Sequence, residues 1–174
     1  LEEKPPGVLI ANPGHGTGTS SVIISPRGNQ DLSDGSEKFV SGVAPGAKLI
    51  PLRVTKSVVL VGMMKLAEAI DYAVEQGAHV ISISLGGLWS LRLQEAVANA
   101  QRQGVIVAAA AGNCVRFVVW PAAFNEVIAV AACNAKRKIW IGSSRGEAVD
   151  VTAPGESVWH AQAKRKEGNG EVSF

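Results

Sequence analysis

The sequence has few charged and few aromatic residues, and it lacks any long hydrophobic run. Of its 174 residues 18% are charged and 5% aromatic, whereas 47% are hydrophobic. This composition excludes a disordered chain. No run approaches the ~20 apolar residues of a membrane span, and the one dense basic cluster, residues 164–166, has no interleaved aromatics. We therefore expect a globular domain with no membrane partner and no nucleic-acid partner.

Cysteine and histidine are also scarce. Cys114 and Cys133 have neither a metal-ligand spacing nor the pattern of a disulfide framework, and the three histidines are far apart. The cysteines therefore indicate neither a metal site nor a cellular compartment. The chain begins at Leu1 without an initiator Met, which is consistent with removal of an upstream region.

Four short apolar runs predict strands of a parallel sheet. They are rich in β-branched residues, continuous rather than alternating, and short enough for strands buried on both faces. The runs are residues 48–54, 78–84, 105–110 and 127–132.

Two amphipathic patterns predict helices between these runs. Apolar residues recur at helical spacing over residues 63–74, before Gly77, and over residues 93–100, before Gly104. Alternating strands and helices require right-handed crossovers, which place helices over both faces of a sheet. We therefore predict one three-layer α/β domain over residues 1–174, with its functional groups at the carboxyl ends of the strands.

A glycine-bordered histidine precedes the first apolar run. His15 lies between two glycines and is followed by small polar residues. Small neighbours leave the edge of an imidazole open to a substrate and let the backbone pass close by. A loop histidine beside a helix capped by Thr17 or Thr19 would give the same pattern, so the motif alone leaves both interpretations open.

An asparagine follows the third predicted strand. Asn113 would present its side-chain amide at the carboxyl end of a central strand. A fixed neutral donor there can stabilise an oxyanion without competing for the proton that a base must receive. Gly-Asn is also a common break after a strand, so ordinary turn chemistry is the alternative.

Six segments, in order, resemble the subtilase family of serine proteases. They are GHGTGTSS (14–21), VSGVAPGAKLIPLRV (40–54), HVISISLGG (79–87), AAAGN (109–113), WPAAF with VIAVAA (120–132) and GSSRGEAVDVTAPGESV (142–158). The resemblance covers nearly the whole chain and implies a subtilisin-like fold and hydrolysis of peptide or protein substrates through an acyl-enzyme. In the family, the proline that Pro121 matches often follows an aromatic residue through a cis peptide bond, so the resemblance also implies a cis bond before Pro121.

The resemblance assigns roles to single residues. His15 would be the general base and acid, and Asn113 would hold the negative charge of the oxyanion. An extended segment, Ser84, Leu85 and Gly86, would pair with the substrate backbone, and Gly86 would leave room for a substrate side chain. Ala110 to Gly112 would form the other wall of that pocket.

The sequence departs from the family at two members of the triad. Subtilases carry Asp, His and Ser in that order, but residues 1–14 contain only Glu2 and Glu3 as acids, and no Gly-Thr-Ser motif follows residue 155. Asp31 and Asp34 come after the histidine, in a polar stretch that we expect to be a loop. We therefore expect a partial catalytic domain that lacks the Asp and Ser segments and is inactive alone.

Three other functions fit parts of the sequence. Residues 142–146 match the G-x-S-x-G nucleophile elbow, but the following residues predict an extended piece rather than the helix that an elbow requires. Glycines at 14, 16 and 18 resemble a dinucleotide-binding turn after a predicted strand at 8–11, but their spacing is G-x-G-x-G. The third is a non-catalytic relative that binds peptide or a partner.

The chemistry implied by the resemblance needs no organic cofactor. Family members often bind calcium for stability, but no acidic cluster in the sequence has the dense oxygen-ligand pattern of a calcium loop. We therefore expect no metal ligand among the catalytic residues and assign no calcium site. A secreted or extracytoplasmic location follows from the resemblance only.

Overall fold

The computed structural model describes residues 14–27, 30–31, 38–39, 41–55, 59–60, 62–161, 164–165 and 172–173. The chain divides into two compact units, each of which is described by itself. Unit 1 comprises Leu1–Ala11 and Val54–Ser157, and unit 2 comprises Asn12–Arg53 and Val158–Phe174. That residues 1–174 form one domain stays a prediction.

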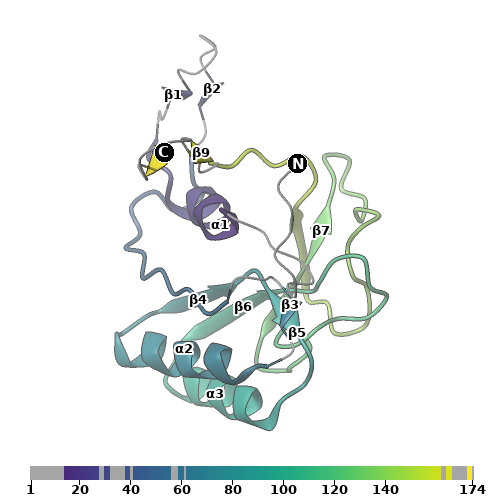
Figure 1. The fold of residues 1–174 in the computed structure, drawn as a ribbon. Coiled ribbons are helices and arrows are strands. Elements are labelled where there is room, and N and C mark those ends of the chain that lie inside the picture. The colour runs from purple at the N-terminus through teal and green to yellow at the C-terminus, as the bar shows by residue number, and fades with distance from the viewer. Residues whose placement is uncertain are drawn as a thin grey trace. The chain divides into compact units, whose positions relative to one another are not determined.

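Unit 1 contains a parallel four-stranded sheet with the order β4-β6-β7-β8. The strands are β4 (Val80–Ile83), β6 (Ile106–Ala110), β7 (Ile128–Cys133) and β8 (Val151–Pro154). Three of the four predicted strands are therefore confirmed, each slightly shorter than or shifted from its apolar run (Figure 1). The fourth strand, β8, is the extended piece that the sequence predicts after residue 146.

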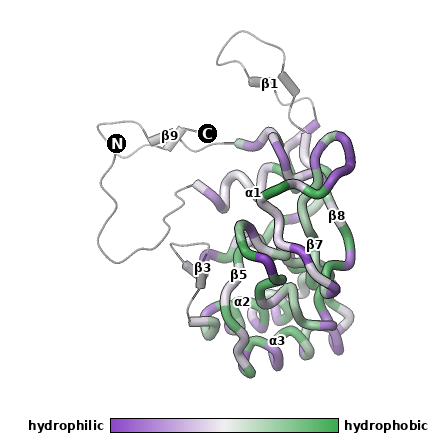
Figure 2. Tube along the Cα trace, turned by 90° about the vertical axis from the view of Figure 1, so that its right-hand side faces the viewer, coloured by the Kyte–Doolittle hydropathy of each residue, from purple (hydrophilic) through white to green (hydrophobic). Residues whose placement is uncertain are grey.

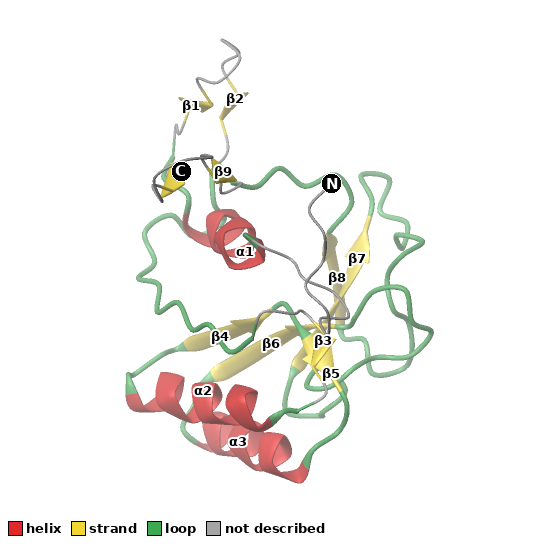
Figure 3. Cartoon of the chain, viewed as in Figure 1, coloured by secondary structure: helices red, strands yellow, loops and turns green. Residues whose placement is uncertain are grey.

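Two helices cover one face of this sheet. They are α2 (Met64–Glu75) and α3 (Leu91–Arg102), which pack on each other and lie on the same side of β4 and β6 (Figure 3). Hydrophilic and hydrophobic residues alternate along both helices (Figure 2), and Ile70, Leu93 and Val97 are almost fully buried. Each such side chain contributes about 1.5–3 kcal/mol by leaving water.

The glycines predicted to end these helices do so. Gly77 and Gly104 come two residues after the last residues of α2 and α3, and both have left-handed backbones, with φ of 74° and 78°. The backbone N–H of Ala78 and that of Val105 then donate back to carbonyls of the last helical turn, Ala73 and Ala100, at 3.0 Å each. A residue without a Cβ turns the chain there at the lowest strain.

On the opposite face of the sheet, the side chain of the first residue in each strand is exposed. The first residues of the four strands, Val80, Ile106, Ile128 and Val151, are 59%, 51%, 41% and 48% exposed. The helix-facing residues Val107, Ala109, Ala129 and Ala131 are 4% exposed or less. The prediction that these strands are buried on both faces is therefore wrong at their first residues, because the described helices of unit 1 pack from one side.

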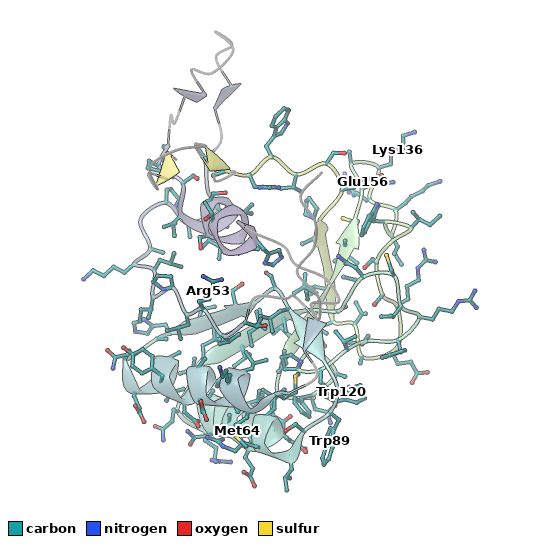
Figure 4. All side chains as sticks on the ribbon, in the orientation of Figure 1. Arg53, Met64, Trp89, Trp120, Lys136 and Glu156 are labelled. Carbon is teal, nitrogen blue, oxygen red and sulfur yellow. The ribbon has the colours of Figure 1, made fainter. Side chains whose placement is uncertain are left out.

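A short parallel pair lies beside this sheet in unit 1. It consists of β3 (Val59–Leu60) and β5 (Gly86–Gly87). Gly87 also forms an antiparallel bridge with Trp120, whose peptide bond to Pro121 is cis, as the resemblance implies. Figure 4 shows Trp120 and Trp89 on the side of unit 1 next to β5.

The described part of unit 2 contains one helix and two short antiparallel pairs. The helix is α1 (His15–Ile24), and the pairs join β1 (Gln30–Asp31) to β2 (Lys38–Phe39) and β9 (Lys164–Arg165) to β10 (Val172–Ser173). Asp31 thus lies in a strand and not in the loop that the sequence predicts. Lys164 and Arg165 of the basic cluster also lie in a strand. The loop predicted at Asp34 and the strand predicted at residues 8–11 lie outside the described residues.

Residues 48–54 do not form the predicted strand. The structure assigns them no regular element, and Leu49, Ile50 and Leu52 are 37%, 42% and 39% exposed. β-branched composition favours a strand only where a neighbouring backbone completes the ladder, and no described strand pairs with this segment. None of the helices in the described ranges has the length and hydropathy of a membrane span.

Candidate active site

The candidate oxyanion donor lies directly after the carboxyl end of β6. Ala111 continues the strand line, because its N–H donates to the Val130 carbonyl at 2.9 Å. Gly112 then turns the chain with φ 112°, and Asn113 is exposed. The turn therefore carries an amide at the sheet edge where functional groups gather in parallel α/β sheets.

The other predicted substrate segment leaves the neighbouring strand at the same edge. Ile83 of β4 pairs with Ala109 of β6 in parallel register, so Ser84 and Ala110 are the next residues along two adjacent strands. Ser84 and Leu85 form the half-buried link between β4 and β5. The structure thus brings all five predicted substrate-binding residues and Asn113 into unit 1 at one edge of its sheet.

Val119 lies between the two predicted substrate segments. A Cβ added to Gly86 would stand 2.5 Å from Val119 Cγ2, and one added to Gly112 would stand 3.1 Å from the same methyl group. The backbone N–H of Val119 donates to the Ala111 carbonyl at 3.0 Å, which fixes its position beside β6. Both glycines are therefore required by close packing against this valine.

The G-x-S-x-G segment does not form a nucleophile elbow. Its central serine, Ser144, is 0% exposed, and Ser143 is 5% exposed. No helix follows, since the next described element is β8. An elbow must raise its serine above the sheet, so the exclusion made from the sequence is confirmed.

In unit 2, His15 is the first residue of α1. Gly14 occupies the N-cap position with φ 80°, and no side chain caps the helix. Thr19 Oγ1 instead donates within the helix, to the His15 carbonyl or the Gly16 carbonyl, at 3.1 Å each. Helix capping by Thr17 or Thr19, the alternative for this motif, is therefore wrong.

The environment of His15 keeps its imidazole neutral. Burial lowers the pKa of His15 below its ordinary value of 6.5, and the charge of nearby His160 lowers it further. The charged form loses solvation and meets a like charge, and both effects favour the proton-free ring. A general base must start proton-free, so this shift suits the predicted role.

A second histidine lies against the same helix. A Cβ added to Gly18 would stand 2.8 Å from His160 Nδ1, so the imidazole of His160 lies directly over this glycine. The next residue is held there as well, because the Ala161 N–H donates to Ser21 Oγ at 2.8 Å. The segment 160–161 is thereby fixed on α1.

His15 and Asn113 belong to different units. His15 lies in unit 2 with His160, and Asn113 lies in unit 1 with the substrate segments. That both groups face one cleft stays a prediction.

Three residues of these neighbourhoods escaped sequence reasoning. Val119 follows another valine in an apolar run that has no motif. His160 is 145 positions from His15 in the chain. The sequence singles out Ser144 only as the serine of a nucleophile elbow that the following residues exclude. The sequence signal for the position of Ser144 is the run of small residues Gly and Ser at 142–144, because small residues permit two backbones to approach closely.

No cluster of three or more His, Cys, Asp or Glu side chains occurs in the ranges that the structure describes. The two free cysteines differ in their environment, since Cys114 is exposed and Cys133 is buried. A calcium site therefore stays unassigned among the described residues.

Comparison with known proteins identifies relatives along the whole chain. The family model described as "Subtilase family" matches residues 3–173. The major intracellular serine protease of Bacillus subtilis (strain 168) is 36% identical over 163 residues, which are 89% of this chain and 49% of that protein. Thermitase of Thermoactinomyces vulgaris is 36% identical over 148 residues, covering 84% of this chain and 50% of thermitase. The chain thus spans about half the length of these curated relatives.

Solved structures show the same relationship. The self-cleaved protease domain of PatA superimposes with a TM-score of 0.70 at 28% identity, over 93% of this chain and 60% of that one. The prenylagaramide maturation protease PagA gives a TM-score of 0.69 at 29% identity, over 85% and 54%. These neighbours confirm the three-layer, subtilisin-like α/β class with its mostly parallel sheet. Together with the family match, they establish that this chain belongs to the subtilase family.

Proposed function

We propose that this chain is part of a serine endopeptidase of the subtilisin type, which hydrolyses peptide bonds through an acyl-enzyme. The observation that carries the proposal is the turn at Gly112 and Asn113, which presents an exposed amide at the carboxyl edge of a parallel sheet. Membership of the subtilase family and relatives named as serine proteases support it. The substrate is a peptide or protein.

In this proposal His15 takes the proton from the serine hydroxyl as that oxygen attacks the carbonyl carbon. It then gives the proton to the leaving amine, and water repeats the sequence to release the acid. The lowered pKa of His15 supports the first step, because it favours the proton-free ring. Asn113 donates its amide N–H to the oxyanion.

The substrate backbone would run beside Ser84, Leu85 and Gly86. These residues leave β4 next to the end of β6, where Ala110 and Gly112 lie. An extended peptide placed there would pair its backbone with that of the segment, which gives affinity with little dependence on sequence. The chemistry needs no organic cofactor, and we assign no calcium site.

The 174-residue chain by itself is proposed to be inactive. Residues 1–14 contain no aspartate, and no Gly-Thr-Ser motif follows residue 155. Loss of the nucleophile alone costs a subtilisin about 10⁶ in turnover. The chain should therefore release no product from peptide substrates above background, and a rate that disappears with His15→Ala would contradict this.

The mechanism is tested in a polypeptide that also supplies the aspartate and the serine. Asn113→Ala should lower kcat by about 10²–10³-fold with little change in KM, which is the known effect of losing this donor in a subtilisin. Asn125→Ala is the matched control, because Asn125 is exposed elsewhere in unit 1. An unchanged kcat in Asn113→Ala would remove Asn113 from the mechanism.

A non-catalytic, peptide-binding relative is the second candidate. Such a relative would keep the sheet and the substrate segments and would bind a peptide without cutting it. It predicts that the 174-residue chain binds extended peptides and that adding the missing segments restores no hydrolysis. Binding without turnover in the extended polypeptide would replace the endopeptidase with this function.

A further inference from the structure

The turn that carries Asn113 is paired with a second segment of unit 1. The Cys114 N–H donates to the Gly142 carbonyl at 2.8 Å, and the Ser144 N–H donates to the Gly112 carbonyl at 2.8 Å. Between these two bonds Asn113 and Ser143 form an antiparallel bridge. The backbone is therefore held immediately before and immediately after Asn113.

A buried hydroxyl extends this pairing. Ser144 Oγ donates to the Val115 carbonyl at 3.1 Å, and Ser144 is 0% exposed. The same oxygen would lie 2.9 Å from a Cβ on Gly112, so it packs against the residue that makes the turn. Ser144 thus contacts the chain on both sides of Asn113, at positions 112 and 115.

The second segment is itself anchored to the sheet. Ser143 Oγ accepts the Ala132 N–H of β7 at 2.9 Å and donates to the Ser144 carbonyl at 3.2 Å. The Trp140 N–H also donates to the Ala132 carbonyl, at 2.9 Å. The segment therefore ties the turn after β6 to the end of β7.

We infer that Ser144 is a positioning residue for Asn113, which holds the amide donor where the oxyanion forms. The inference rests on the proposed function, because it deepens the role of the same turn. An oxyanion donor works only if it is oriented before the charge appears, and a displacement of about 1 Å weakens it strongly. Ser144 does not touch substrate and acts through the backbone of residues 112–115.

The first experiment measures amide hydrogen exchange in the 174-residue chain. Ser144→Ala removes the hydroxyl but keeps the backbone N–H, so we expect exchange at Cys114 and residue 144 to become about 10-fold faster or more. The amides of Val107 and Val130, in β6 and β7, should keep their rates. Ser82→Ala is the control, because Ser82 is an exposed residue of β4.

Two results of this experiment overturn the inference. Unchanged exchange at Cys114 would show that the hydroxyl does not hold the turn. Equal acceleration at Val107 and Val130 would show a general loss of stability instead of a local one. Ser144→Thr, which keeps the hydroxyl, should restore slow exchange at Cys114 if it folds, and the local comparison in Ser144→Ala decides the matter if it does not.

The second experiment uses the polypeptide that carries all three triad members. Ser144→Ala should lower kcat by about 10-fold and leave KM unchanged. In the double variant with Asn113→Ala, the serine change should add almost nothing, because the donor that it positions is already gone. Full additivity would overturn the inference, whereas loss of any effect of Asn113→Ala would overturn the proposed function and leave the exchange result standing.

Discussion

The Cγ2 methyl group of Val119 stands 2.5 Å from the point that a Cβ on Gly86 would occupy. The sequence predicts that Gly86 leaves room for a substrate side chain, but in the structure a side chain of the protein itself uses that room. The same methyl group also lies 3.1 Å from a Cβ placed on Gly112. Val119 therefore limits the space between the two segments that are proposed to hold the substrate.

This arrangement predicts a preference for small residues at the position before the cleaved bond. In a polypeptide that also supplies the aspartate and the serine, we expect peptides with Gly or Ala there to be cleaved faster than peptides with Phe. Val119→Gly should reduce this preference by about 10–200-fold or more, because a single methylene group in an apolar pocket is worth that range. The measurement is kcat/KM for a series of peptides that differ only at this residue.

The control for this prediction is Val115→Gly, which removes a half-exposed valine from the loop after Asn113. It should lower activity on all peptides about equally. If Val119→Gly also changed every kcat/KM by one common factor, Val119 would not determine specificity.

The second prediction concerns the titration of His15. Replacing His160 with Gln removes a charge that lowers the pKa of His15, so this pKa should rise, but not fully to 6.5, because burial lowers it first and most. Titration of the histidine C–H signals by NMR measures the shift in the 174-residue chain. His79→Gln, at an exposed position of unit 1, is the control.

The sign of the effect on stability follows from the same shift. Because the folded pKa of His15 is lowered, the unfolded chain binds more protons between that pKa and 6.5. This contribution to the free energy of unfolding is therefore fully present above pH 6.5 and is lost as the pH falls through the folded pKa. An unchanged pKa of His15 in His160→Gln would contradict the influence of the His160 charge on His15.

The third prediction separates backbone strain from close packing at Gly112. Gly112 has φ 112° and would place a Cβ 2.9 Å from Ser144 Oγ, Gly104 has φ 78° with open space, and Gly62 has neither constraint. We expect Gly62→Ala to be neutral or slightly stabilising. Gly104→Ala should cost about 1–3 kcal/mol, and Gly112→Ala should cost more than Gly104→Ala. Urea unfolding gives all three values, and equal costs at 104 and 112 would argue against the packing.

The fourth prediction tests the helix-facing core. Leu93 is 0% exposed in α3, whereas Leu91 of the same helix is 59% exposed. Leu93→Ala should lower the free energy of unfolding by about 2–5 kcal/mol, and Leu91→Ala should change it by about 0.5 kcal/mol or less. Similar losses in the two variants would mean that α3 does not pack as described.

The elements that could be predicted from the sequence are those fixed by local pattern. The helices before Gly77 and Gly104 and the strand before Asn113 follow from apolar spacing and from a residue that must turn the chain. Residues 48–54 have strand composition but no strand, because pairing depends on a partner that composition does not specify.

The candidate site divides in the same way. Asn113 and the segments beside it could be predicted, because each carries a motif at the end of a strand. Val119 and Ser144 could not, because their positions depend on contacts across the sheet with Gly86, Gly112 and Val115. A valine and a serine have no local signature for such contacts.

The exposed first residues of the four sheet strands affect how the chain behaves in solution. They are Val80, Ile106, Ile128 and Val151. These β-branched side chains begin four adjacent strands, and each is between 41% and 59% exposed. Exposed apolar side chains on neighbouring strands attract dyes such as ANS and other apolar molecules. Preparations of the 174-residue chain should therefore scatter more light as concentration rises, and replacing Ile106 with Lys should improve its solubility.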